Sequence, residues 1–169
     1  TSEGIWTAGA AYDEAADILY VSQGGVNEIL AINPVTGKVV GTFSTGDSTG
    51  NTAETSKHFF VNMTIDAKGK RLFASDGNTN QVYVADIASG KFIQTIPVAA
   101  QGILDVLYNP ARNELYVTSR GVTRSEPNGS GSLTIIDGAS FKVKSTLSVP
   151  VHPNSLAVSP DGQSLYVTI

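Results

Sequence analysis

The chain contains no cysteine, so disulfide bonds, thiolate metal sites and a cysteine nucleophile are excluded. Charged residues make up only 15% of its 169 residues, and the net charge is −4. This balance gives no general attraction to nucleic acid or to an anionic membrane surface. Long apolar runs are also missing, since none approaches the roughly 20 residues of a membrane-spanning helix. No stretch has the helical period of an α/β protein, which leaves β-structure as the expectation.

The chain does contain a unit that recurs four times. Runs of the type LYV begin at Leu19, Leu72, Leu115 and Leu165 and are therefore 53, 43 and 50 residues apart. The middle spacing matches the roughly 40–45 residues of a four-stranded propeller blade. The 17 glycines and 7 prolines suit many strands joined by tight turns.

Each unit has the same order of elements. An apolar run leads through a turn such as NPARN or SPDGQ into the LYV run, and a loop, a third run, a second turn and an alternating run follow. The sequence predicts an all-β fold in one domain, residues 1–169: a β-propeller fragment with three complete four-stranded blades and the first two strands of a fourth. The blades are expected at about 4–43, 59–96, 102–147 and 154–169. A two-sheet sandwich is the alternative, but it would not explain four units of one order.

The strands of a unit differ in how apolar they are. The first two are almost continuously apolar, as in strands buried on both faces, whereas the fourth alternates, as in FKVKSTL. This gradient is expected from the axis to the rim of a propeller. Because the chain ends inside a blade at Ile169, we expect it to be a piece of a longer ring, with unpaired edges through which copies could associate.

Two insertions interrupt the repeat, in Ser44–His58 and in Ser119–Gly131. The first lies between the fourth strand of one unit and the first strand of the next, and the other lies between the second and third strands of a unit. Connections of these two kinds emerge at the same face of a propeller, which we call the loop face. Binding residues concentrate on loops held by a rigid scaffold, so the loop face is the predicted site.

The segments LYVTSRG, LYVSQGG and LYVTI resemble the YVTN-type β-propeller repeat. From Lys57 onward, HFFVNMTID, VLYNPARNELYVTSR, IIDGASFKV and VHPNSLAVSPDGQSLYVTI together resemble the YncE-like exported bacterial propellers. The resemblance implies a seven-bladed ring, a periplasmic or secreted location and no enzymatic activity. Some members of this family have been linked to single-stranded DNA, so the resemblance makes DNA a candidate partner.

Both histidines, His58 and His152, end a connection on the predicted loop face, and Asn154 follows closely. The two imidazoles could meet at the mouth of the central channel, where Asp76 or Asp105 would have to complete a metal site. The alternative is that each histidine packs against its neighbour and bonds to backbone. No tight ligand spacing supports a metal, so we predict no metal and no cofactor.

Single-strand binding needs a basic groove and aromatic rings on which bases stack. Lys57, Arg120 and Arg124 are the basic candidates on the loop face. The stacking candidates are Phe59, Phe60 and Tyr108. Acidic residues are expected on the same face, so the charge pattern alone does not favour DNA, and a protein partner is the other possibility.

Catalytic motifs are missing. The run Asn128–Ser132 has its glycines in the wrong places for a nucleophile elbow, and no P-loop, HExxH or EF-hand pattern occurs. The sequence therefore predicts a non-enzymatic binding module that acts through its loop face. A lactonase-like metal-dependent propeller is the enzymatic alternative, and a structural cell-surface protein is the other.

Overall fold

The computed structural model describes residues 6–24, 26–47, 55–121, 129–150 and 152–169, which form fourteen β-strands and no helix. The described part of the chain accordingly has no helix long and apolar enough to cross a membrane. The strands are β1 (Trp6–Asp13), β2 (Ile18–Gly24), β3 (Glu28–Ile32), β4 (Val39–Ser44), β5 (Phe60–Asp66), β6 (Arg71–Asp76), β7 (Gln81–Asp86), β8 (Lys91–Pro97), β9 (Ile103–Asn109), β10 (Glu114–Ser119), β11 (Gly131–Asp137), β12 (Val143–Val149), β13 (Leu156–Val158) and β14 (Leu165–Val167).

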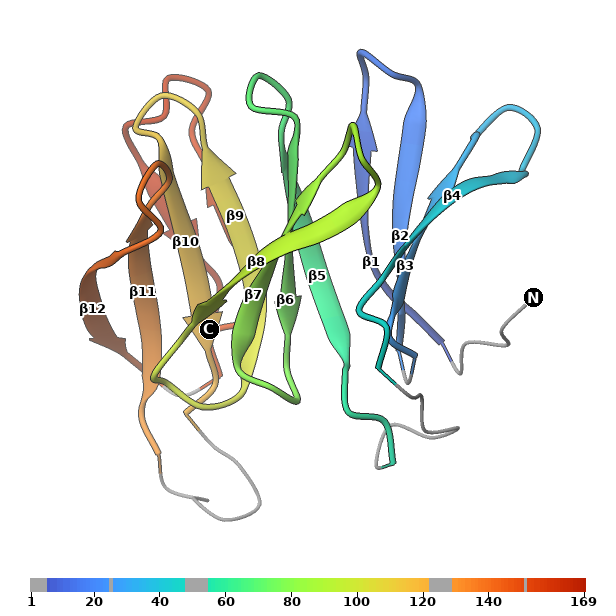
Figure 1. Cartoon of the computed structure of the whole chain (residues 1–169). Helices are drawn as coiled ribbons and strands as arrows, with labels where there is room; N and C mark the ends of the chain where they lie inside the picture. The colour runs from blue at the N-terminus through green and yellow to red at the C-terminus, as the bar shows by residue number, and fades with distance from the viewer. Residues whose placement is uncertain (1–5, 25, 48–54, 122–128, 151) are drawn as a thin grey trace.

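The strands form four antiparallel sheets in simple chain order: β1–β4, β5–β8, β9–β12 and the two-stranded β13–β14. The first strands of successive sheets lie side by side, since β1 contacts β5, β5 contacts β9 and β9 contacts β13. The sheets fan out from these inner strands (Figure 1). This arrangement confirms the predicted fold class, an all-β propeller fragment.

Two apolar clusters hold the sheets together. The cluster between the first and second sheets includes Phe43, Phe60 and Leu72, and the one between the second and third includes Phe73 and Ile103. Neighbouring residues of β6, Leu72 and Phe73, belong to different clusters because successive side chains of a strand point to opposite faces. Burial on both faces explains why the second run of each unit is almost continuously apolar.

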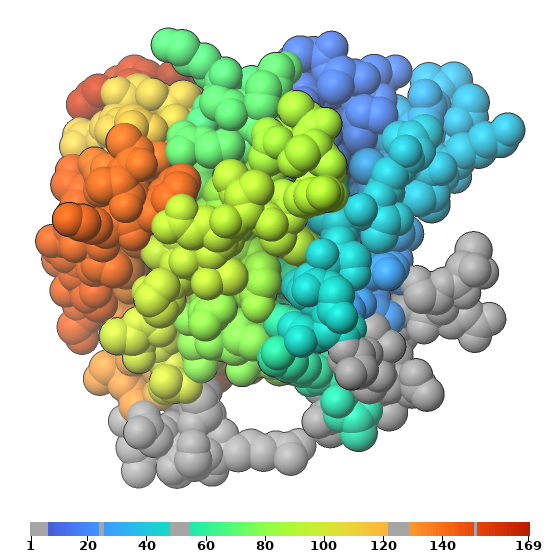
Figure 2. Space-filling view, in the orientation of Figure 1, coloured from blue at the N-terminus to red at the C-terminus, as the bar shows by residue number. Residues whose placement is uncertain are grey.

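The fourth strands form the outer rim. In Figure 2, β4, β8 and β12 lie on the visible surface in cyan, yellow-green and orange. In β8 the side chain of Ile96 is buried while Ile93 is 58% exposed, as the alternating sequence predicts. β12 differs, because six of its seven residues are exposed and none is buried. One face of β12 is directed toward the two-stranded sheet, and two strands cover less of this face than four strands would.

The two ends of the fan carry different connections. The 13–17 and 66–70 turns, which join first to second strands, lie at the top of Figure 1, and the described parts of the connections between sheets lie at the bottom. The bottom is the loop face defined above. The inner strands therefore begin at the loop face and run away from it.

Candidate binding site where the inner strands begin

A hydroxyl group fixes the start of the inner strand in all four sheets. The fourth residue of the LYV-type run is serine or threonine each time, and its oxygen accepts a hydrogen bond from a backbone N–H of the inner strand. The four bonds run from Gly9 N to Ser22 Oγ (2.8 Å), Asn62 N to Ser75 Oγ (3.1 Å), Asp105 N to Thr118 Oγ1 (3.1 Å) and Ser155 N to Thr168 Oγ1 (3.0 Å). In the three four-stranded sheets this bond lies at a β-bulge, where the pairing register shifts.

The bulges surround a cavity of about 330 Å³ near the loop face, which we call the axial pocket. Every sheet contributes to it at equivalent positions of the repeat, with small, amide, hydroxyl or carboxylate side chains among the apolar ones. The lining residues are Ala8, Val61, Asn62, Leu104, Asp105, Asn154 and Ser155. Asn154 and Ser155 are exposed, so their polar groups are available to a molecule in the pocket.

Side chains at the bulges connect one inner strand to the next. Asn62 Nδ2 donates to Asp105 Oδ1 at 2.5 Å, and Asp105 Oδ2 accepts from the backbone N–H of Leu156 at 2.7 Å. Burial raises the pKa of the Asp105 carboxyl above its usual value, and the hydrogen bonds from Leu156, Asn62 and Val106 offset this only in part. The hydrogen bonds from Asn62 to Asp105 and from Leu156 to Asp105 therefore include a carboxylate whose ionisation is opposed by burial.

His58 lies inside the protein rather than at the mouth of the channel. Its imidazole is fully buried, with Nδ1 2.6 Å from Asp76 Oδ2 and Nε2 2.8 Å from Asp47 Oδ2. The ring also stacks on Phe60, with centroids 5.9 Å apart. His58 thus bonds to carboxylates, which neither the metal interpretation nor the backbone alternative predicted.

The other histidine is in a different environment. His152 is exposed, with a left-handed φ of 62°, and Asn154 is exposed beside the axial pocket. Of the two carboxylates named as metal ligands, Asp76 bonds to His58 and Asp105 bonds to Asn62. Within the described residues, no group of three or more histidine, aspartate or glutamate side chains could hold a metal ion.

The basic candidates differ in their surroundings. Lys57 is exposed, but its Nζ lies 2.8 Å from Asp47 Oδ1, and that bond, with the one from His58, lowers the pKa of the Asp47 carboxyl. Arg120 is exposed and follows β10 at the loop face. Arg124 lies outside the described residues.

The stacking candidates do not form a platform for bases. Phe60 is completely buried, and Phe59, directly before β5, is half-buried. Tyr108 belongs to the other end of the molecule, and its grouping with the loop face was wrong. It is the sixth residue of β9, its hydroxyl donates to Asn113 Oδ1 at 2.9 Å in the 109–113 turn, and its ring lies 6.0 Å from the Arg71 guanidinium.

Known proteins resemble this chain along almost its whole length. The protein named Uncharacterized protein YncE of Salmonella typhi is 34% identical over 166 residues, 98% of this chain. The protein of the same name from Escherichia coli K12 is 35% identical over the same length. This similarity makes the chain YncE-like.

The YncE-like chain spans 42% of the length of these relatives. No protein-family model matches it. Among solved structures, a chain of Kuenenia stuttgartiensis hydrazine synthase superposes with a TM-score of 0.80 over 96% of this chain and 43% of that one. The two are only 17% identical, so this likeness shows the propeller fold alone.

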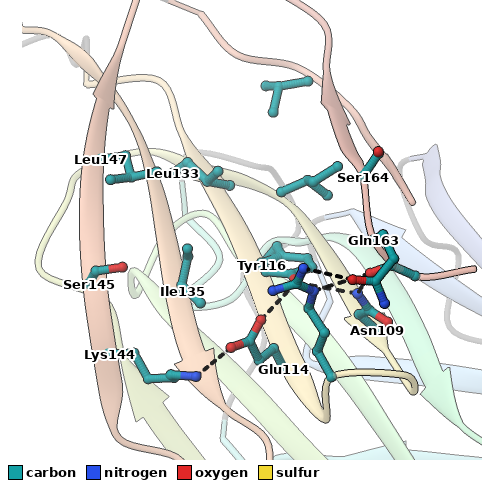
Figure 3. A pocket seen from close by; sticks show the side chains of 14 residues that line it. Asn109, Glu114, Tyr116, Leu133, Ile135, Lys144, Ser145, Leu147, Gln163 and Ser164 are labelled. Carbon is teal, nitrogen blue, oxygen red and sulfur yellow. Dashed lines mark hydrogen bonds and ion pairs between the residues drawn. The ribbon is translucent and has the colours of Figure 1, made fainter. Parts of the chain in front are cut away.

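The YncE-like chain has a second cavity, of about 420 Å³, between the third sheet and the two-stranded sheet (Figure 3). Leu133, Ile135 and Leu147 form its apolar wall, and Lys144 Nζ lies 2.5 Å from Glu114 Oε1 at its polar end. In the second sheet the residues at the equivalent positions are buried against the third, whereas Leu147 is 49% exposed. This cavity is therefore a space between the third sheet and the two-stranded sheet that follows it. Self-association through unpaired strand edges stays a prediction.

Sequence reasoning missed the groups that build the axial pocket, Asn62, Ser155 and the four hydroxyls. A signal for the hydroxyls was present, because the runs LYVS, LFAS, LYVT and LYVT all place serine or threonine in fourth position. Asn62, Asp105 and Ser155 also lie at matching distances from the LYV-type runs. Aligning the units residue by residue would have placed them together.

Proposed function

We propose that the YncE-like chain is part of a non-enzymatic, exported propeller that binds a macromolecular partner at its loop face. The observation that supports this most directly is the axial pocket, to which all four sheets contribute at equivalent positions. Hydrogen bonds to hydroxyls fix the backbone around it, so its shape exists before a ligand arrives. Such preorganisation lowers the entropic cost of binding.

The reactive side chains of this face have structural partners. His58 and Asp76 bond to one another inside the protein, and Asp76 Oδ1 also accepts from the backbone N–H groups of Phe59, Asn78 and Thr79. These contacts support a structural role for this pair over an acid–base one. The lactonase-like alternative stays a prediction, and hydrolysis of a lactone by the purified protein would support it.

Among macromolecules, the described charges favour a protein partner over single-stranded DNA. DNA binding needs cations that can replace the counterions of several phosphates. Lys57 is bound to Asp47, Phe60 is buried, and Tyr108 lies at the opposite end of the molecule. The axial pocket offers amide, hydroxyl and carboxylate groups, which suit the backbone and polar side chains of a polypeptide.

Position-specific photo-cross-linking in living cells of the source organism tests the proposal. A photoreactive phenylalanine analogue replaces Asn154 beside the axial pocket, or Asp161 in the exposed turn at the opposite face. We expect protease-sensitive adducts from position 154 and few from 161. Nuclease-sensitive adducts would identify DNA instead, and equal adducts from both positions, or none, would contradict a loop-face site.

A further inference from the structure

Among the buried carboxylates of the described residues, Asp105 differs from most others in having no lysine, arginine or histidine partner. Asp66 lies 2.6 Å from the Arg71 guanidinium, Glu114 lies 2.5 Å from Lys144, and Asp76 lies 2.6 Å from His58. Asp13, also buried, caps the 13–17 turn through the N–H groups of Ala15 and Ala16.

All donors to Asp105 are neutral. Asn62 Nδ2 and the backbone N–H of Val106 bond to Oδ1, and the backbone N–H of Leu156 bonds to Oδ2. Within the described residues, no lysine, arginine or histidine lies within ion-pair distance of it. Asp105 is also largely buried, because the residue is only 6% exposed.

A buried carboxylate is unfavourable unless a positive charge compensates it. Neutral N–H donors compensate it only in part here, because burial still dominates and raises the pKa of Asp105. A carboxylate can accept about four hydrogen bonds and three are in place, so one acceptor position remains. Asp105 lines the axial pocket, which gives a ligand access to it.

We propose that the axial pocket binds a primary ammonium group, which pairs with the Asp105 carboxylate and contacts the exposed polar groups of Asn154 and Ser155. Val61 and Leu104 would pack against the methylene chain that bears the ammonium. The inference rests on the proposed function, because it names the chemistry recognised at the same site. The ammonium could come from a lysine of a partner protein or from a free polyamine.

Carboxyl ¹³C NMR of labelled full-length protein tests the proposal, with the Asp105 resonance assigned by its loss in Asp105→Asn. The probes are the peptide acetyl-Gly-Ser-Lys-Ser-Gly-amide, the same peptide with norleucine in place of lysine, and putrescine. We expect the lysine peptide to shift the resonance saturably and to lower its titration midpoint, while the norleucine peptide has no effect. A response to putrescine but not to the peptide would assign the site to a free polyamine.

The variants give a second measurement. We expect Asp105→Asn to weaken peptide binding at least tenfold, and Asp161→Asn, an exposed carboxylate at the opposite face, to leave it unchanged. If Asp105→Asn fails to fold, through-bond correlation of the carboxyl carbon with the Asp105 backbone amide assigns the resonance in the wild-type protein, and the ¹³C titration still decides the question. No saturable shift with either cation would refute the ammonium assignment, and cross-links at position 154 would then show that the loop-face proposal survives without it.

Discussion

Nδ1 of His58 lies 2.6 Å from Oδ2 of Asp76, and both side chains are completely buried. The second imidazole nitrogen faces Asp47 at 2.8 Å. Both imidazole nitrogens therefore have a carboxylate oxygen as partner. His58 thereby connects Asp47, in the segment that follows β4, to Asp76 in the second sheet. These contacts fix one side of the loop face.

Replacing His58 by alanine should destabilise the protein strongly. The change leaves a buried oxygen of Asp76 without its hydrogen-bond partner, which typically costs about 1–3 kcal/mol, and more where the group is charged. Urea unfolding at neutral pH measures the free energy of unfolding. His152→Ala is the matched control, because His152 is exposed and its loss should change stability by less than about 0.5 kcal/mol. Equal effects of the two substitutions would show that the buried pair is not structural.

Gly9→Ala should disturb the contact between the first two inner strands. A Cβ at position 9 would lie 2.7 Å from the Cα of Asn62 and from the carbonyl oxygen of Val61, and both are backbone atoms that cannot swing aside. We expect a loss of about 1–3 kcal/mol in the free energy of unfolding, as for other overpacked sites.

The control for this substitution is Gly41→Ala in β4. There the added Cβ would meet only the Cβ of Ala31, at an ordinary 3.6 Å. Stability should therefore be retained or should rise slightly. A Gly9→Ala protein as stable as the Gly41→Ala protein would mean that the inner strands do not pack as closely as described.

The hydroxyl groups at the bulges should contribute more to the free energy of unfolding than exposed threonine hydroxyls do. Thr118→Val keeps the side-chain shape but removes the acceptor for the buried N–H of Asp105, which costs about 1–3 kcal/mol. Thr95→Val, on the exposed strand β8, should be nearly neutral. Both values come from the same urea titrations, and a difference below about 0.5 kcal/mol would speak against the role of the hydroxyl.

Glu114 should make stability depend on pH. Burial opposes its ionisation, but hydrogen bonds from Lys144 and Tyr116 outweigh burial and lower the pKa of Glu114 below its usual 4.5. The unfolded chain then binds the proton more tightly, so this stabilisation is present above pH 4.5 and is lost as pH falls through the native pKa. The difference in stability between wild type and Glu114→Gln should therefore be largest near pH 7 and should shrink below pH 4.5.

A double-mutant cycle isolates the ion pair in this pH series. In a Lys144→Met background, the Glu114→Gln substitution should lose much of its pH-dependent effect, because the first bond that lowers the Glu114 pKa is already gone. An unchanged pH dependence in that background would assign the effect to Tyr116 instead.

The sequence was sufficient for the architecture because the repeat is visible in local patterns. The LYV-type runs mark the second strand of each sheet, and apolar and alternating runs mark inner and outer positions. The environment of His58 was not visible in this way. Its partners lie 11 and 18 residues away in the chain, and nothing local distinguishes a histidine between two carboxylates from one that is exposed.

The placement of Tyr108 was an error that the sequence could have prevented. Tyr108 directly precedes Asn109, where the NPARN turn begins, and that turn belongs to the face opposite the loop face. In contrast, no pattern in one segment could reveal the hydrogen bonds that Asp105 accepts from Asn62 and Leu156, because these residues belong to three different inner strands. Only alignment of the units in register places these residues together.

Hydroxyl-radical footprinting of the protein bound to its purified cross-linked partner tests the central claim most directly. The account predicts that the partner protects Val61 and Leu104, which line the axial pocket, and leaves Val35 unprotected. Val35 is 82% exposed in the 33–38 turn at the opposite face, so it reports on binding there. Protection of Val35 with unchanged labelling of Val61 and Leu104 would contradict a binding site at the start of the inner strands.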